Sequence, residues 1–432
     1  MSSTKVNELL TFIQHSPTPF HAVSNLSALF SEHGFVRLDE KNDWQLASAG
    51  KYFLVRSDSS IVAFILGNDS CVEQGIRLVG AHSDSPCLKV KPTPEILKND
   101  YLQLGVEIYG GVLLNPWFDR DLSLAGKITA LDDKGTLVSV LIDFKKPIAT
   151  IPSLAIHLDR EANSNKTVNP QREMNAILWQ SKEKTSFKER LLKQAALEHP
   201  ELPLTDILDY NLSFYDTQPP AVIGMDDEFI ASARLDNLLS TYVGARALLN
   251  ADSTCTSVFI CNDHEEIGSS SEVGAQGTLL NDVIARLVPN VIDQQKCMRR
   301  SLMLSVDNAH GIHPNYADKH DQGHGPELNA GPVIKFNAGQ SYATNSETAA
   351  VLRVLAVSTP STIPLQNFVM RADLRCGSTI GPITATNSGI KTVDLGVATF
   401  AMHSIRELGG VHDVNMLHNL LARFYTCEQL PI

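Results

Sequence analysis

The stretch Ser257-Val-Phe-Ile-Cys-Asn-Asp-His-Glu-Glu266 passes from a short apolar run directly into acidic and histidine side chains. Three other segments, Leu78–Asp84, Met303–Asp307 and Ala398–His403, follow the same pattern and end in a His or Asp. Short apolar runs of this kind are typical of strands buried on both faces in an α/β sheet. Because ligands of such sheets bind outside the carboxyl ends of the strands, we expect these side chains to meet at one edge.

The rest of the chain alternates strands and helices at both ends but not in the middle. Residues 1–92 and 231–432 show strand–helix alternation, which favours a helix-covered, mostly parallel or mixed sheet. Residues 93–230 hold mainly short strand-like runs, among them Leu154–Leu158. We therefore expect a discontinuous α/β domain, 1–92 and 231–432, into which a β-rich domain of residues 93–230 is inserted.

Composition and charge exclude several classes of protein. Hydrophobic residues make up 43% and charged residues 19% of the 432 residues, which is ordinary globular usage in a chain too long for one core. Lys and Arg number 36 against 48 Asp and Glu, a net charge of −12, so neither nucleic acid nor an anionic membrane is an expected partner. The N-terminus lacks the features of a signal peptide and the seven cysteines are scattered, which predicts a cytoplasmic protein.

The metal-capable side chains form a recognisable set. Asp236, at the expected first turn of a helix, joins the strand-end residues to give five candidate ligands: His82, Asp236, Glu266, Asp307 and His403. Imidazole and carboxylate ligands suit zinc, manganese or cobalt and suit calcium poorly. Five ligands exceed the need of one tetrahedral zinc ion and fit two ions that share a carboxylate. Of the adjacent pair Glu265-Glu266, one can bind metal while the other takes a proton from water.

Each of these residues also has a simpler interpretation. A single His or Asp at a strand end is more often a cap, and Glu265-Glu266 alone could form a solvated turn; only their joint occurrence favours a metal site. His264-Glu-Glu-Ile-Gly268 is not the HExxH zinc helix, because Gly268 replaces the second His. Other di-metal hydrolases, such as an acylase or a phosphoesterase, stay open. So does a non-enzymatic assembly protein with a vestigial metal site, although an intact Glu265 argues against it.

Six longer motifs carry a more specific signal across nearly the whole chain. They are Ser16-Pro-Thr-Pro-Phe-His-Ala-Val23, Gly80-Ala-His-Ser-Asp-Ser-Pro86, Ala233-Arg-Leu-Asp-Asn237, Asp263-His-Glu-Glu-Ile-Gly-Ser269, Asp307-Asn-Ala-His-Gly-Ile-His-Pro-Asn315 and Met402-His-Ser-Ile-Arg-Glu407. Together they resemble the aspartyl aminopeptidase family of dinuclear zinc aminopeptidases, in its bacterial type. The resemblance implies a metal-dependent aminopeptidase that removes N-terminal amino acids, preferably Asp or Glu, from peptides.

The resemblance also implies how two metal ions would be held in each subunit. Two zinc ions, for which manganese or cobalt could substitute, would share Asp236. One ion would also bind His82 and Asp307, and the other would bind Glu266 and His403.

Further roles follow from the same resemblance. Glu265 would be the general base, and Asp84 would orient His82. The substrate pocket would be lined by four residues: His310, His313, Lys335 and Tyr342. A cation in the pocket would be needed to select acidic residues, and Lys335 and Arg406 are the candidates.

The inserted domain would have its own function under this resemblance. It would form dimers, and His157 would reach into the active site of a neighbouring subunit, as a metal ligand or as a substrate contact. The dimers would assemble into a tetrahedral dodecamer that admits peptides rather than folded proteins.

Overall fold

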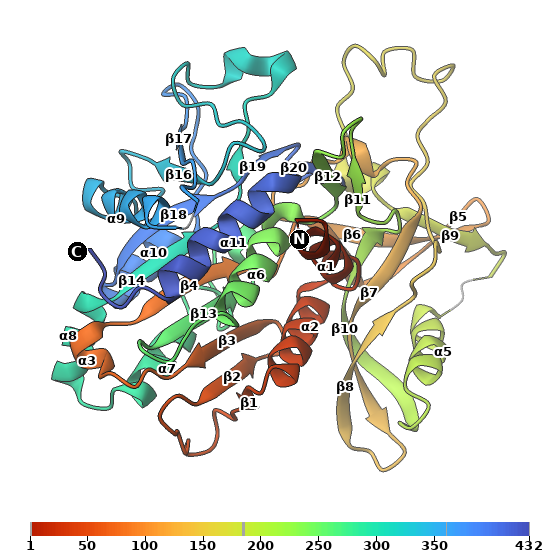
Figure 1. Cartoon of the computed structure of the whole chain (residues 1–432). Helices are drawn as coiled ribbons and strands as arrows, with labels where there is room; N and C mark the ends of the chain where they lie inside the picture. The colour runs from red at the N-terminus through yellow and green to blue at the C-terminus, as the bar shows by residue number, and fades with distance from the viewer. Residues whose placement is uncertain (1, 184–185, 360, 432) are drawn as a thin grey trace. The chain divides into compact units, whose positions relative to one another are not determined.

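The computed structural model describes residues 2–183, 186–359 and 361–431 and contains two compact units (Figure 1). The first unit comprises residues 1–84, 220–402 and 407–432, and the second comprises 85–219 and 403–406. Both junctions of the inserted segment therefore lie before the boundaries expected from the sequence. Residues 403–406, expected in the first domain, group with the second unit.

A nine-stranded mixed sheet forms the centre of the first unit. Its strand order is β1-β2-β3-β13-β4-β14-β18-β16-β17. Strands β13 (Ser257–Asn262), β4 (Arg77–His82), β14 (Leu302–Val306) and β18 (Lys391–Gly396) are mutually parallel. The flanking strands are β1 (Val36–Arg37), β2 (Lys51–Arg56), β3 (Ser60–Ile65), β16 (Val333–Phe336) and β17 (Gln366–Val369). The predicted α/β class is confirmed.

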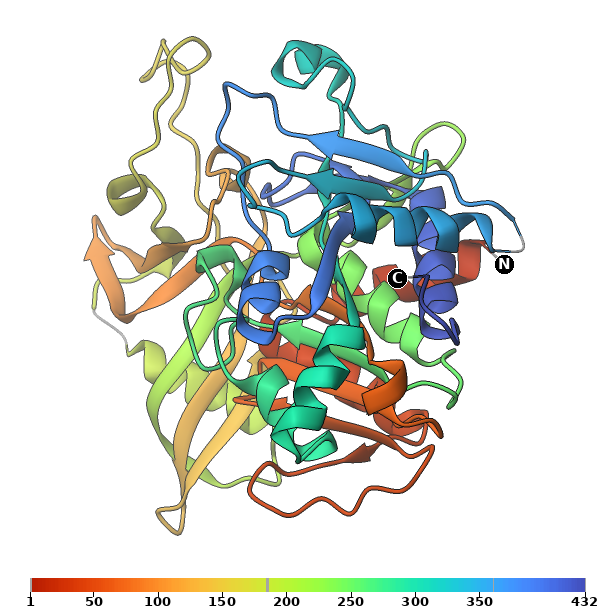
Figure 2. The ribbon, with the colours of Figure 1, turned by 90° about the vertical axis from the view of Figure 1, so that its left-hand side faces the viewer.

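Helices cover both faces of this sheet, which is why every residue of β4, β13 and β14 is buried. Val79 and Phe259 pack into one apolar cluster with helices α6 and α11, while their neighbours Leu78 and Val258 pack into another with α7 and α10. Figures 1 and 2 show α6 and α11 on the face opposite to α10. The helices are α1 (Ser2–Gln14), α2 (Pro19–Glu32), α3 (Cys71–Gln74), α6 (Leu235–Leu248), α7 (Leu279–Leu287), α8 (Val291–Arg300), α9 (Ser346–Val357), α10 (Ile380–Ser388) and α11 (Val411–Tyr425).

A separate five-stranded sheet corrects one expectation. It consists of β11 (Ala221–Ile223), β12 (Phe229–Ser232), β20 (Glu407–Gly410), β19 (Ala398–Phe400) and β15 (Ala309–His310), in that order. The apolar run before His403 was expected to be a strand of the central sheet, but it contains β19, and β18 is the strand beside β14. That expectation was wrong because an apolar run shows that a strand is buried, not which sheet it joins.

The second unit is built on a six-stranded antiparallel sheet of order β8-β7-β10-β5-β6-β9. Its elements are β5 (Cys87–Lys98), β6 (Tyr101–Tyr109), β7 (Leu122–Asp132), β8 (Leu137–Asp143), α4 (Pro170–Glu173), β9 (Ala176–Gln180), α5 (Phe187–Glu198) and β10 (Leu204–Asp216). The strand expected at Leu154–Leu158 is absent from the described residues: the segment is an exposed turn in which Leu158 is 74% exposed. Its apolar residues have no partner strand there, so β propensity alone does not make it a strand. Nowhere in the described chain is a helix both long and apolar enough to span a membrane.

Candidate metal centre

Two parallel strands and the start of a helix bring the first three site residues to the same edge of the central sheet. His82 is the last residue of β4 and pairs in register with Asn262, the last residue of β13. Asp307 directly follows β14, on the other side of β4. Asp236 approaches from the first turn of α6. The proximity of His82 and Asp307 follows from the parallel pairing, which places the carboxyl ends of their strands together.

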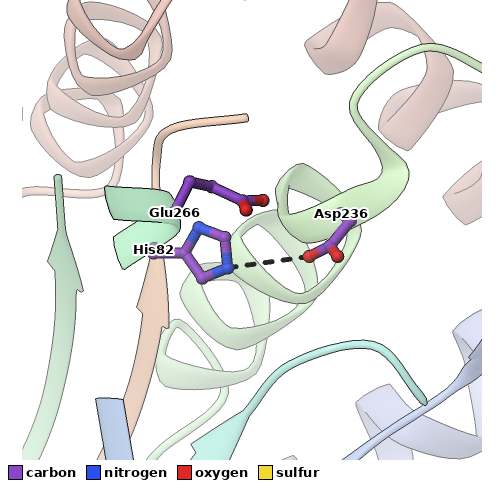
Figure 3. Close-up of side chains that lie close together, drawn as sticks. All are labelled: His82, Asp236 and Glu266. Atoms are coloured by element: carbon purple, nitrogen blue, oxygen red, sulfur yellow. Dashed lines mark ion pairs between the residues drawn. The ribbon is translucent and has the colours of Figure 1, made fainter. Parts of the chain in front are cut away.

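Five of the predicted site residues lie close together at this edge. One ligand atom from each of His82, Asp236 and Glu266 lies within 4.8 Å of the other two, and Figure 3 shows these side chains converging. His82 Nε2 is 3.6 Å from Asp236 Oδ1 and 3.5 Å from Asp307 Oδ1. Glu265 Oε2 lies 3.9 Å from the same nitrogen. The His82 and Asp236 side chains are only 2% and 5% exposed, so these polar groups are held away from water.

The turn that carries both glutamates is fixed by a single carboxylate. After β13 the chain enters the left-handed region at His264 (φ 62°) and forms a short 3-10 helix, η2 (Glu265–Ile267). Asp84 Oδ1 accepts the backbone N–H of Glu265 and Oδ2 accepts that of Glu266, each at 3.1 Å. Asp84 Oδ1 also lies 3.3 Å from His82 Nδ1. Asp84 therefore contacts the histidine expected from the sequence and, in addition, the backbone of both glutamates.

The electrostatics of the cluster favour a bound cation. Burial raises the pKa of Glu265 to about 8; His82 opposes this shift and Asp307 reinforces it. Burial and Asp236 raise the pKa of Glu266 well above its usual range. Burial would lower the pKa of His82, but Asp236, Asp307 and Asp84 raise it instead. The raised pKa values show that these carboxyl groups resist ionising side by side, and a bound divalent cation would stabilise their charged forms, so the residues fit a metal ion.

Polar groups that the sequence interpretation missed hold together the segments that carry the candidate ligands. Thr241 Oγ1 of α6 donates to the carbonyl of His82 at 2.7 Å, and Asn237 Nδ2 donates to the carbonyl of Val306 at 2.8 Å. Glu407 Oε2 accepts the backbone N–H of Asp236 at 2.9 Å. Asn237 and Thr241 are four residues apart on one helix face, so their polarity on a buried helix was a usable signal. Glu407 offered no such local signal.

Of the four residues assigned to the substrate pocket, Lys335 lies beside Asp307 and Tyr342 lies next to Lys335. Lys335 Nζ is 3.1 Å from Asp307 Oδ2 and 5.3 Å from the centre of the Tyr342 ring. Phe368 contacts both Tyr342 and His310, with ring centres 6.4 and 5.7 Å away. His313 instead packs against Phe400 and Tyr316, with ring centres 5.3 and 4.9 Å away.

Three further residues of interest belong to the second unit. The His403 ring is half-buried, and its Nδ1 lies 3.1 Å from the carbonyl oxygen of Gly111. Arg406 donates to the carbonyl of Pro219 at 3.0 Å. His157 is exposed in the turn described above. The roles of His403 in metal binding and of His157 in metal or substrate binding stay predictions from the sequence.

Comparison with known proteins gives consistent matches over nearly the whole chain. Residues 12–425 match the family model described as aminopeptidase I zinc metalloprotease (M18). A protein of Pseudomonas savastanoi pv. phaseolicola, named probable M18 family aminopeptidase 2, is 55% identical over 427 residues, which are 98% of this chain and 99% of the relative.

Two solved structures are similar as well. A chain in a cryo-EM structure of the Ape4 and Nbr1 complex is 36% identical with a TM-score of 0.94, over 98% of this chain and 86% of that one. The S. cerevisiae mApe1 dodecamer is 27% identical with a TM-score of 0.84, over 97% and 95%.

Proposed function

Because the chain belongs to the M18 family of aminopeptidase I zinc metalloproteases, we propose that it removes N-terminal residues, preferably acidic ones, from peptides with two zinc ions. The family establishes the coarser statement, that the enzyme is a metal-dependent aminopeptidase. The convergence of His82, Asp236 and Glu266 is the observation that carries the proposal.

The proposed ligands match the chemistry of zinc. His82 offers an imidazole nitrogen, and Asp236, Glu266 and Asp307 offer carboxylate oxygens, the groups that zinc binds in catalytic sites. When bound, zinc supplies Lewis-acid chemistry that polarises a carbonyl group and makes water more acidic. One catalytic zinc ion usually has three protein ligands, and this site offers four, which supports two ions.

Proton transfer falls to Glu265 in this proposal. Glu265 would take a proton from the attacking water and return it to the nitrogen of the leaving peptide. The N–H···O bond to Asp84 fixes its backbone, so the carboxylate is already positioned when a peptide arrives.

The preference for acidic residues rests on Lys335. Its side chain is 3% exposed, and its ammonium group already pairs with Asp307. An ammonium has three donors, so Lys335 retains capacity to bind a substrate carboxylate beside the metal ligands.

A panel of substrates tests the proposal. Aspartate- and glutamate-nitroanilides should be hydrolysed faster than leucine-nitroanilide, with two zinc equivalents bound per chain. N-acetylated amino acids and phosphate esters should not be turned over, because an aminopeptidase requires a free amine. Faster hydrolysis of the leucine substrate would contradict the acidic preference, and one zinc equivalent would contradict the dinuclear centre.

We also propose a cytoplasmic homo-oligomer, a dodecamer built from dimers. The similarity to the mApe1 dodecamer supports assembly. Further support comes from the exposed apolar side chains of Leu154, Ile156 and Leu158, because such patches mark protein contacts. His157, within this segment, would then contact the active site of a partner subunit.

Subunit mixing tests the proposed role of His157. The His157→Ala variant should fold and assemble normally but turn over substrate slowly. Mixed oligomers of this variant with Glu265→Gln should regain part of the activity, because one site then combines an intact Glu265 with an intact His157 from the partner. Verified mixed oligomers that stay inactive would show that the histidine is not shared.

A further inference from the structure

Glu407 is a buried carboxylate that none of the proposed catalytic steps uses. It is the first residue of β20, pairs in register with Ser232 of β12, and is 2% exposed. Its Oε2 accepts the backbone N–H of Asp236 at 2.9 Å. Burying a carboxylate costs free energy unless it is hydrogen-bonded, and this hydrogen bond offsets part of that cost.

The N–H of Asp236 needs an acceptor from outside its own helix. Asp236 lies in the first turn of α6, where backbone N–H groups have no intrahelical partner. Its backbone is not helical there (φ −84°, ψ 106°). The carboxylate of Glu407 supplies the acceptor, and a charged acceptor makes the stronger kind of hydrogen bond.

This contact restrains the backbone from which the side chain of Asp236 extends. Asp236 Oδ1 lies 3.6 Å from His82 Nε2, so a small rotation of the Asp236 backbone would move it away from the other ligands. Asn237 and Thr241 attach the same helix to the strands that carry Asp307 and His82, but through their own side chains. Glu407 acts on the ligand residue itself.

We propose that Glu407 is a positioning residue for metal binding, which holds the backbone of Asp236 so that its carboxylate meets the other ligands. The inference rests on the proposed function, because it takes Asp236 to be a metal ligand. It predicts that the side-chain acceptor at 407, rather than its negative charge, sustains zinc affinity.

Three variants separate these two properties. Glu407→Ala removes the acceptor and should raise the zinc dissociation constant about 10–100-fold, the usual effect of losing a group that orients a ligand. Glu407→Gln keeps an acceptor oxygen at the same reach and should lose much less. Glu407→Asp keeps the charge but is shorter by one methylene, so it should resemble Glu407→Ala. Zinc affinity is measured by competition with a chromogenic chelator, and folding by circular dichroism.

Asp413 provides the matched control. It is fully buried and also binds backbone groups, accepting the N–H of Asn329 at 2.7 Å and that of Gly331 at 2.9 Å, but it holds a loop that carries none of the proposed ligands. Asp413→Ala should lower the melting temperature without changing zinc affinity.

The outcomes are distinguishable. Zinc bound equally by wild type and all Glu407 variants would overturn the inference alone, as would equal loss of affinity in Glu407→Ala and Asp413→Ala. A wild-type protein that binds no zinc would overturn the proposed function and this inference with it. If Glu407→Ala does not fold, Glu407→Gln against Glu407→Asp gives the same comparison: higher affinity in the aspartate variant would contradict the role of the acceptor.

Discussion

The Glu265→Gln variant is expected to lose about 10²–10⁴-fold in kcat while it keeps the zinc content of the wild type. Glutamine fills the same space and leaves the backbone bond to Asp84 in place, but its amide cannot take a proton from water. The measurement is steady-state hydrolysis of an aspartate-nitroanilide, with zinc determined on the same preparation.

A glutamate in the same loop gives the control for that result. Glu272 is exposed and accepts a hydrogen bond from Ser57 Oγ at 2.6 Å, outside the ligand cluster. Glu272→Gln should leave both kcat and zinc content unchanged. Full activity in Glu265→Gln would mean that another group acts as the base.

The Glu266→Gln variant should instead lose zinc and activity together. An amide oxygen lacks the negative charge with which a carboxylate binds zinc, so we expect affinity to fall by at least about 10²-fold, beyond the usual loss for an outer residue. Activity measured against added zinc should recover in part. Dialysis against a chelator buffer followed by zinc titration measures both quantities.

The activities of the two variants are therefore expected to differ in their response to added zinc. Activity of Glu265→Gln should not respond, because its defect is in proton transfer. If Glu265→Gln loses zinc and Glu266→Gln keeps it, the roles of the two residues are exchanged.

The central sheet was predictable from the sequence because its strands carry a strong local signal. Strands β4, β13 and β14 each contain a continuous apolar run and are buried at every position, as expected for a sheet covered on both faces. His82 and Asp307 stand at or directly after the ends of such strands, so their proximity followed from parallel pairing. The first turn of α6, with Asp236, was predictable for a similar reason: its pattern is helical and begins with an acidic residue.

Other features depend on contacts between distant parts of the chain. The strand Ala398–Phe400 joins the five-stranded sheet, which its own residues do not encode. The apolar segment around His157 forms no strand, because no partner strand within the described subunit pairs with it. The hydrogen bond between Glu407 and Asp236 joins residues far apart in sequence, so the role proposed for Glu407 could be inferred only from the fold.

The two oxygens of Asp84 hold the N–H groups of consecutive residues, so the backbones of Glu265 and Glu266 share one anchor. A protein engineer could not shift one glutamate without displacing its neighbour, because a single anchor fixes both. Redesign of the selectivity of this enzyme is therefore better directed at segments that this anchor does not restrain. Phe368 and the two rings that it contacts, Tyr342 and His310, belong to such segments.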